Sequence, residues 1–315
     1  MNIESLITHI TPRREVRGMA AALLPYTDDG RIAVDSFQRQ LQTMHRAGLM
    51  CAVNMDTGYV NYLADEEKQL VLDWAREALG PGVGFVAGAY IERHDGDNLV
   101  SLYRREMDAI VERGGIPIIF QSARMHGKSP REKIRLYADI CRDYPEVLGF
   151  ELGRMFAPNG EIFDAETVRG LMQIPSLTGI KHSSLDRMQE FGRLAIRDEM
   201  RPEFRIYTGN DLGINMIEYG SDYLLGLAAF APEKFAERDR LWAAGDVRYY
   251  ALSDALQHLG NIAFRAPVPA YKHAAAIFLH LTGKIPSPLA HTQSPRRPPW
   301  EAELLRDCAT RLDLL

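Results

Sequence analysis

The sequence predicts a (β/α)8 barrel, the fold in which eight parallel strands alternate with helices. Short apolar runs alternate with longer helical patterns over about the first 230 of the 315 residues. Eight strand–helix pairs in about 230 residues is the number and length of this barrel. The apolar runs lack a strict alternation of polar and apolar residues, which suits parallel strands covered on both faces.

Each of the eight expected strands is a short, mostly apolar run. Turn residues separate a run from the helical pattern that follows it, as at 25–30 after the first run. The expected strands are 18–24, 49–54, 83–87, 116–120, 148–152, 177–181, 204–208 and 223–227.

The helical segments show apolar side chains three or four residues apart. After the first strand, Phe37, Leu41 and Met44 recur at this spacing, and Gly48 follows as a stop signal. Residues 129–132 (Ser-Pro-Arg-Glu) form a capping box with proline at the first helical position, which opens a helix to about Arg142. Further helical segments are expected at 65–79, 99–111, 164–172, 185–196 and 212–219.

After the eighth strand the pattern changes, because only helical stretches follow. These are expected at 233–244, 249–262 and 271–281, with a proline-rich turn at 295–299. We therefore expect a barrel over residues 1–231 and a C-terminal helical extension over 232–315. The alternative is an open doubly wound sheet, but no G-x-G-x-x-G follows the first strand to support a dinucleotide site.

Composition indicates a soluble, cytoplasmic protein. The net charge of −5 is mild and no basic block stands out, so neither nucleic acid nor a membrane surface is an expected partner. Cys51, Cys141 and Cys308 are widely spaced, which fits a reducing compartment. Residues 1–5 do not begin a signal peptide, and no apolar run reaches the roughly 18 residues of a spanning helix. The nine histidines form no metal-binding pattern, so no metal site is expected.

Lys181 ends the sixth expected strand, Leu-Thr-Gly-Ile-Lys. Burying an unpaired ammonium costs several kcal/mol. Desolvation instead lowers the pKa of a lysine, and the neutral amine is then able to attack a carbonyl carbon. If Lys181 projects inward at the strand end, it is a candidate Schiff-base nucleophile.

Other polar residues fall at the same mouth of the barrel, where the C-terminal ends of the strands place catalytic groups. Asp56 and Tyr59 follow the second strand, Arg124 follows the fourth, and Glu151 lies on the fifth. The guanidinium of Arg124 suits a carboxylate or a sugar-acid hydroxyl. Thr57 and Gly58 suit a substrate carboxylate held by backbone N–H groups, because glycine lets the backbone approach an anion.

Several stretches resemble the dihydrodipicolinate synthase / N-acetylneuraminate lyase family of Schiff-base aldolases. Gly-Ile-Lys-His-Ser-Ser around Lys181 resembles the run around that family's imine-forming lysine, and Asp-Thr-Gly-Tyr at 56–59 resembles its substrate-carboxylate loop. The similarity extends in order and spacing over about residues 18–300. Its other matching stretches are 22–30, 207–211, 220–232 and 269–272.

The resemblance implies a lyase or aldolase that acts on pyruvate or another 2-oxo acid through a Lys181 imine, without a cofactor. It also implies a homotetramer or homodimer. Asp56, Thr57, Gly58 and Arg124 are then expected to bind substrate. The matching stretches around the seventh and eighth strands add Gly209 and Leu225 to this group.

The departures from the family pattern concern proton transfer. The family places a tyrosine on the fifth strand, where this chain has Phe150, and a phenyl ring transfers no proton. Glu151, if turned inward, and Tyr59 are the expected replacements. Asp56 and Tyr59 also depart from the family's substrate loop, which disfavours lysine biosynthesis. Two alternatives remain open: a 2-oxo-3-deoxy sugar acid dehydratase with the same imine chemistry, and a barrel that binds such acids without turning them over.

Overall fold

A computed structural model describes residues 8–315 and forms a closed parallel barrel in which each strand pairs with its sequence neighbour and β8 pairs with β1. This confirms the predicted fold class. The expectation about residues 1–5 lies outside the described residues. The strands are β1 (Gly18–Ala21), β2 (Met50–Val53), β3 (Phe85–Ala89), β4 (Gly115–Ile119), β5 (Val147–Leu152), β6 (Leu177–Ser183), β7 (Arg205–Thr208) and β8 (Asp222–Leu225).

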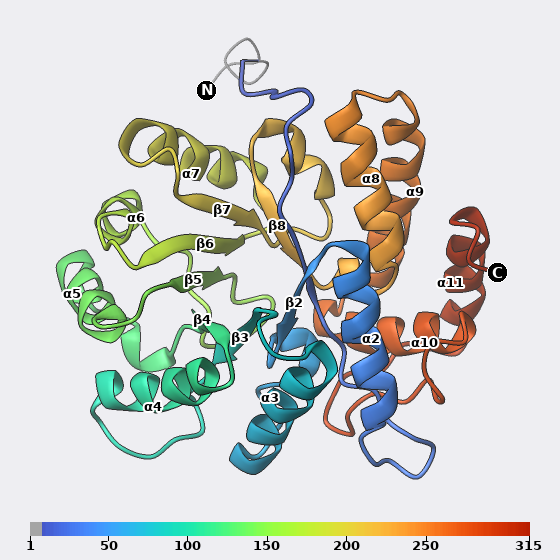
Figure 1. Ribbon diagram of the computed structural model, residues 1–315, viewed down its shortest axis with the longest axis horizontal. Coiled ribbons are helices and arrows are strands. Elements are labelled where there is room, and N and C mark those ends of the chain that lie inside the picture. The colour runs from blue at the N-terminus through green and yellow to red at the C-terminus, as the bar shows by residue number, and fades with distance from the viewer. Residues whose placement is uncertain (1–7) are drawn as a thin grey trace.

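Helices surround the strands, and most lie where their apolar spacing predicts them (Figure 1). The α-helices are α2 (Val34–Ala47), α3 (Asp65–Leu79), α4 (Leu99–Glu112), α5 (Pro130–Cys141), α6 (Ala165–Met172), α7 (Arg187–Met200), α8 (Pro232–Ala244), α9 (Arg248–Ala263), α10 (Tyr271–Leu281) and α11 (Glu301–Arg311). Short 3-10 turns are η1 (Asp56–Gly58), η2 (Ala123–Met125), η3 (Ile214–Tyr219), η4 (Leu227–Ala229) and η5 (Val268–Ala270).

The segment predicted as a helix at 212–219 is instead the 3-10 turn η3. The Asn210 side chain accepts a hydrogen bond from the Leu212 N–H (3.1 Å), and the Asn210 carbonyl accepts one from Gly213 (2.9 Å). Such local bonds compete with a helix, so the regular turn begins only at Ile214. The predicted capping box is present: Ser129 and Glu132 each accept a hydrogen bond from the other's backbone N–H.

The core has two parts. One fills the inside of the barrel, with Met19, Val86, Ile118, Phe150 and Leu224 among its members. The other, larger part lies between the barrel and the helices. Because successive side chains of a strand point to opposite faces, each strand contributes to both parts, and the face of a residue decides whether it reaches the barrel mouth.

The C-terminal helices group beside α2, with α11 farthest from the strands (Figure 1). Helix α8 packs against α2 and β1, so it covers the barrel although it follows the predicted boundary at residue 231. That boundary stays a prediction. Among the described helices, none is both long and apolar enough to cross a membrane.

Candidate active site

Lys181 projects into the barrel from β6. In the sheet it stands between Phe150 of β5 and Tyr207 of β7, both members of the interior core. Its side chain is 9% exposed, and its Nζ lies 4.4 Å from the centre of the Phe150 ring. Burial lowers the pKa of Lys181 to about 8, although the carboxylates of Asp211 and Asp56 act in the opposite direction. The amine is therefore partly neutral near pH 7.5.

Gly209, just after β7, leaves the space that the Lys181 side chain occupies. A Cβ on Gly209 would lie 2.7 Å from Lys181 Cε and 1.9 Å from Ser183 Oγ, both far closer than van der Waals contact. The Gly209 N–H donates to the His182 carbonyl at 2.7 Å, which holds the two strand ends together at this point. Ser183 shares the inward face with Lys181, and its buried hydroxyl has no hydrogen-bond partner among the described residues.

Asp211, just after β7, is a second titratable group near Lys181, and it was not among the expected proton-transfer residues. It is 5% exposed, and burial raises its pKa to about 7, while the Leu227 N–H and the charge of Lys181 favour its ionised form. The Leu227 N–H donates to Asp211 Oδ1 at 2.8 Å. Its position two residues after Gly209, at the end of β7, could have indicated a role in the site, since residues at strand ends line the mouth of such barrels.

Aromatic rings continue from Lys181 around the interior of the barrel. The Phe150 ring meets Phe120 edge-on at 4.9 Å between ring centres, and Phe120 meets Tyr90 edge-on at 5.7 Å. Tyr90 and Phe120 line a cavity of about 230 Å³ at the mouth, together with Asp56 and Lys272. On the side of β4 and β5 the wall beside Lys181 is thus apolar, and Asp56 and Lys272 lie at the rim.

Asp56 lies at this rim in a network with α10. Its carboxylate accepts hydrogen bonds from Lys272 Nζ and from the Tyr271 hydroxyl, each at 3.0 Å. The Tyr271 hydroxyl also lies 2.8 Å from Thr57 Oγ1. A Cβ on Gly226 would lie about 3 Å from both Tyr271 and Thr57, so a glycine there permits their approach. Lys272 is a second lysine of the mouth, 1% exposed and ion-paired with Asp56.

Glu151 faces the helices rather than Lys181, which corrects the expectation that it turns inward. The next residue after inward Phe150 points outward by strand alternation. Arg193 of α7 binds both of its carboxylate oxygens, at 2.8 and 3.0 Å, and His182 Nδ1 lies 2.6 Å from Oε1. Full burial alone would raise the pKa of Glu151, but these partners lower it to about 2. A carboxylate held this way is a poor proton shuttle at neutral pH.

Tyr59 also lies away from the mouth cavity. It belongs to the core between barrel and helices, with its ring 5.9 Å from that of Tyr26 and 5.7 Å from that of His291. Burial raises its pKa well above the ordinary value for tyrosine, and its hydroxyl has no hydrogen-bond partner among the described residues. This position does not favour the expected role in proton transfer.

Three of the expected substrate contacts have other partners. The Arg124 guanidinium donates to the carbonyls of Gly96 (2.8 Å) and Ile91 (2.7 Å), so it holds the loop after β3. Leu225 belongs to the core between β8 and the helices, since its neighbour Leu224 takes the inward face. The Gly58 N–H donates to the Met55 carbonyl at 3.0 Å, and this bond competes with a substrate carboxylate. Asp56, Thr57 and Gly209 do lie at the mouth.

The comparisons with known proteins agree with this architecture. The sequence model of a family described as "Protein of unknown function (DUF993)" matches residues 19–314. The chain belongs to this family. A relative, the 4-hydroxy-tetrahydrodipicolinate synthase of Kosmotoga olearia, is 24% identical over 236 residues, which cover 73% of this chain and 77% of the relative. The predicted likeness to the dihydrodipicolinate synthase family is thereby confirmed at the level of distant sequence similarity.

Solved structures of that family share the fold. The dihydrodipicolinate synthase of Thermotoga maritima superposes with a TM-score of 0.79 at 16% identity, covering 96% of this chain and 100% of that one. A prophage protein of the dihydrodipicolinic acid synthase family from E. coli K12, solved in complex with pyruvate, gives a TM-score of 0.80 at 14% identity, with 95% and 99% covered. The Acinetobacter baumannii synthase, also complexed with pyruvate, gives 0.78 at 18% identity, with 96% and 100% covered.

Proposed function

We propose that this protein is a class I lyase that forms a Schiff base between Lys181 and a 2-oxo acid, with pyruvate as the simplest substrate. The observation that carries the proposal is a buried lysine, with a pKa lowered to about 8, pointing into a barrel whose solved relatives include pyruvate complexes. At pH 7 about one tenth of such an amine is neutral, against less than one thousandth at the ordinary pKa of 10.5.

The chemistry begins when the Lys181 amine attacks the keto carbon of the acid. The resulting carbinolamine loses its oxygen as water once that oxygen is protonated. In a 4-hydroxy-2-oxo acid the protonated imine at C2 then accepts the electrons of the C3–C4 bond, which leaves an enamine; protonation of the enamine at C3 and hydrolysis release pyruvate and free Lys181. In cleavage, a base removes the proton from the substrate hydroxyl; in condensation, the steps run in reverse.

Asp211 is the group we assign to proton transfer, in the role expected of Glu151 or Tyr59. Its pKa of about 7 means that both protonation states are populated near neutrality, as general acid–base catalysis requires. It is also close enough to Lys181 for each charge to alter the pKa of the other group. Phe150 then provides an apolar surface against which the Lys181 Nζ lies.

Borohydride trapping tests the imine. The protein is incubated with pyruvate and sodium borohydride, and its intact mass should increase by the reduced pyruvyl group, with peptide mapping placing the group on Lys181. Lys181→Ala should give no adduct. Lys284→Met is the control, because Lys284 is exposed and lies outside the cavity at the mouth, and this variant should still be modified on Lys181. An unmodified wild-type protein across a panel of 2-oxo acids would refute the proposal.

A second candidate function is binding of a keto or sugar acid without turnover, favoured by the phenyl ring of Phe150 in place of a hydroxyl. Turnover assays with 4-hydroxy-2-oxo acids and 2-oxo-3-deoxy sugar acids separate the candidates. Release of pyruvate indicates an aldolase, and loss of water indicates a dehydratase. A trapped adduct without release of either product would favour the binding role.

A further inference from the structure

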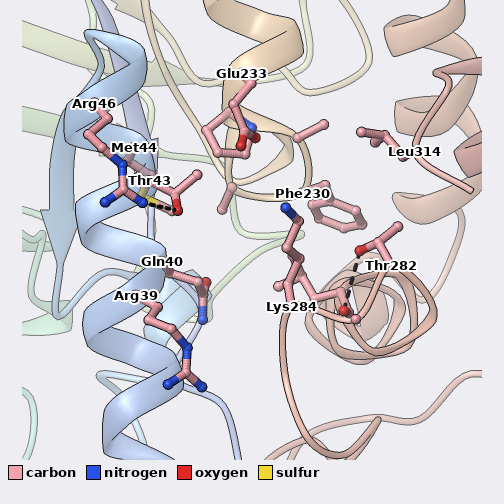
Figure 2. A pocket seen from close by; sticks show the side chains of 15 residues that line it. Arg39, Gln40, Thr43, Met44, Arg46, Phe230, Glu233, Thr282, Lys284 and Leu314 are labelled. Carbon is pink, nitrogen blue, oxygen red and sulfur yellow. Dashed lines mark hydrogen bonds between the residues drawn. The ribbon is translucent and has the colours of Figure 1, made fainter.

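The mouth cavity, the space of about 230 Å³ at the barrel mouth, offers room for the part of a substrate beyond its keto carbon. Phe120 lines this cavity and meets Phe150 edge-on at 4.9 Å, and the centre of the Phe150 ring lies 4.4 Å from Lys181 Nζ. Another cavity, of about 240 Å³, lies between α2, the turn into α8 and the segment after α10 (Figure 2). None of its lining residues belongs to a strand, so a substrate attached to Lys181 extends into the mouth cavity instead.

Most side chains around the mouth cavity are apolar or aromatic. Among the described residues that line it, ten of fourteen are aromatic, aliphatic or proline. Tyr90 and Phe120 belong to the interior core, and the half-buried Phe156 packs against that core from the loop between β5 and α6. Three rings from three segments of the chain thus line one space, which favours a flat apolar group.

The mouth cavity has no unpaired cation for a second acidic group on the substrate. Lys272 is the one cation among the described residues that line it, and it is 1% exposed, with its Nζ donating to Asp56 at 3.0 Å. Arg124 donates to backbone carbonyls, and the exposed Arg154 does not line the cavity. A second carboxylate or a phosphate would therefore lose hydration without gaining a free partner.

A chain of hydroxyl groups is disfavoured as well, because each buried hydroxyl needs a hydrogen-bond partner. The Asp56 carboxylate already accepts from two donors on α10. The Asn159 amide donates to the Gln121 carbonyl at 2.5 Å. The rings of Phe120 and Phe156 offer no hydrogen bond, whereas an apolar group gains from burial against them.

The volume of the mouth cavity suits one aromatic ring with a short linker. A cavity of about 150 Å³ holds benzene, so by proportion one of about 230 Å³ accommodates roughly nine non-hydrogen atoms. Benzaldehyde is close to this size, and a second ring would not fit.

We propose that the mouth cavity holds an aryl group, and that the substrate is a 4-aryl-4-hydroxy-2-oxobutanoate. This inference rests on the proposed function. In cleavage the 4-hydroxyl loses its proton, the C3–C4 bond breaks with its electrons passing to the iminium at Lys181, and the aryl aldehyde leaves. Protonation of the enamine at C3 and hydrolysis then release pyruvate. The aryl ring packs on Phe120 and Phe156.

Borohydride trapping with a matched series of 2-oxo acids tests the proposal. 2-Oxo-4-phenylbutanoate, 2-oxopentanoate and 2-oxoglutarate carry a phenyl, a methyl and a carboxylate group on the same carbon, and none has the 4-hydroxyl that cleavage requires. Half-saturation of trapping on Lys181 should need at least about tenfold less of the phenyl compound than of either other acid, or of 2-oxo-3-deoxygluconate. With 4-hydroxy-4-phenyl-2-oxobutanoate, the wild-type protein should release benzaldehyde and pyruvate.

Phe156 provides the matched variants, compared under conditions in which circular dichroism shows folded protein. Phe156→Ala should reduce the preference for the phenyl over the methyl compound about fivefold, and Phe156→Leu, which keeps an apolar side chain, should reduce it less. Met155→Ala is the control, because the neighbouring Met155 is 49% exposed and does not line the cavity, so the preference should stay.

Four results would overturn the proposal: no preference for the phenyl compound, tighter trapping of 2-oxoglutarate or of the sugar acid, an unchanged preference in folded Phe156→Ala protein, or no release of benzaldehyde. Trapping of pyruvate itself separates this inference from the proposed function. If pyruvate is trapped on Lys181 and the phenyl compound is not preferred, only the aryl substrate is wrong. If no 2-oxo acid is trapped, the imine itself is wrong.

Discussion

Gly209→Ala should slow imine formation because it obstructs the Lys181 side chain. The added Cβ would lie 2.7 Å from Lys181 Cε, and ordinary contact begins at 3.4 Å, so the amine-bearing carbon must move by about 0.7 Å. The contact with Ser183 Oγ, at 1.9 Å, is closer still. A displacement of about 1 Å at a reacting group costs up to about 100-fold in rate, and overpacking a core costs about 1–3 kcal/mol in stability.

The assay is the rate of borohydride-trapped pyruvate adduct, followed by intact mass under conditions in which circular dichroism shows the variant to be folded. Gly192→Ala is the matched control: it makes the same change within α7, where the added Cβ meets no atom within 4 Å. Adding Ser183→Gly to Gly209→Ala removes the closer of the two clashes and should restore part of the rate. If folded Gly209→Ala protein forms the adduct at the wild-type rate, the path assigned to the Lys181 side chain is wrong.

Three further predictions concern charge. At pH 8, Asp211→Asn should raise the free energy of unfolding by up to about 4 kcal/mol, because burial raises the pKa of this carboxyl from 3.8 to about 7 and folding must bury its charge. The gain should vanish below about pH 3, where the carboxyl is protonated in both the folded and the unfolded protein. Urea unfolding at pH 8 and at pH 3 measures it, and equal stability of the variant and the wild type at pH 8 would contradict the assignment. Glu151→Gln should lower the free energy of unfolding by about 3–5 kcal/mol at pH 7, because it leaves Arg193 buried without its carboxylate. Borohydride trapping of pyruvate by the folded protein should stay normal; loss of trapping in folded protein would support Glu151 as a catalytic group. Phe150→Leu should lower the pH midpoint of trapping by about one unit, because the ring stabilises the Lys181 ammonium; an unchanged or higher midpoint would show that the ring has no such effect.

The fold was predictable because it depends on a pattern repeated along the whole chain. Eight apolar runs and the apolar spacing of the helices specify the barrel without any single residue being decisive. Lys181 was predictable for a related reason: an amine within an apolar strand has few structural roles, and the surrounding residues resemble a known imine site.

The group proposed here for proton transfer, Asp211, was not predictable, since its position depends on which face of a strand a residue occupies and on contacts between distant segments. Glu151 and Phe150 are adjacent, yet one faces Arg193 on α7 and the other faces Lys181. A shift of one residue exchanges these faces. Burial against the turn that follows β8 raises the pKa of Asp211. In the sequence, the neighbouring glycine and asparagine indicate only a loop. Lys272 reaches Asp56 from 216 residues away.

The burial that raises the pKa of Asp211 also lowers that of Lys181, and the two pKa values become nearly equal. Free aspartic acid and lysine differ by more than six pKa units, so a proton shared between them would always sit on the amine. Here the pKa values are about 7 for Asp211 and about 8 for Lys181, so each group populates both of its protonation states near neutral pH. Near neutral pH, some molecules therefore carry an uncharged Lys181 amine and some carry a protonated Asp211 carboxyl, which are the two forms that the proposed imine chemistry uses.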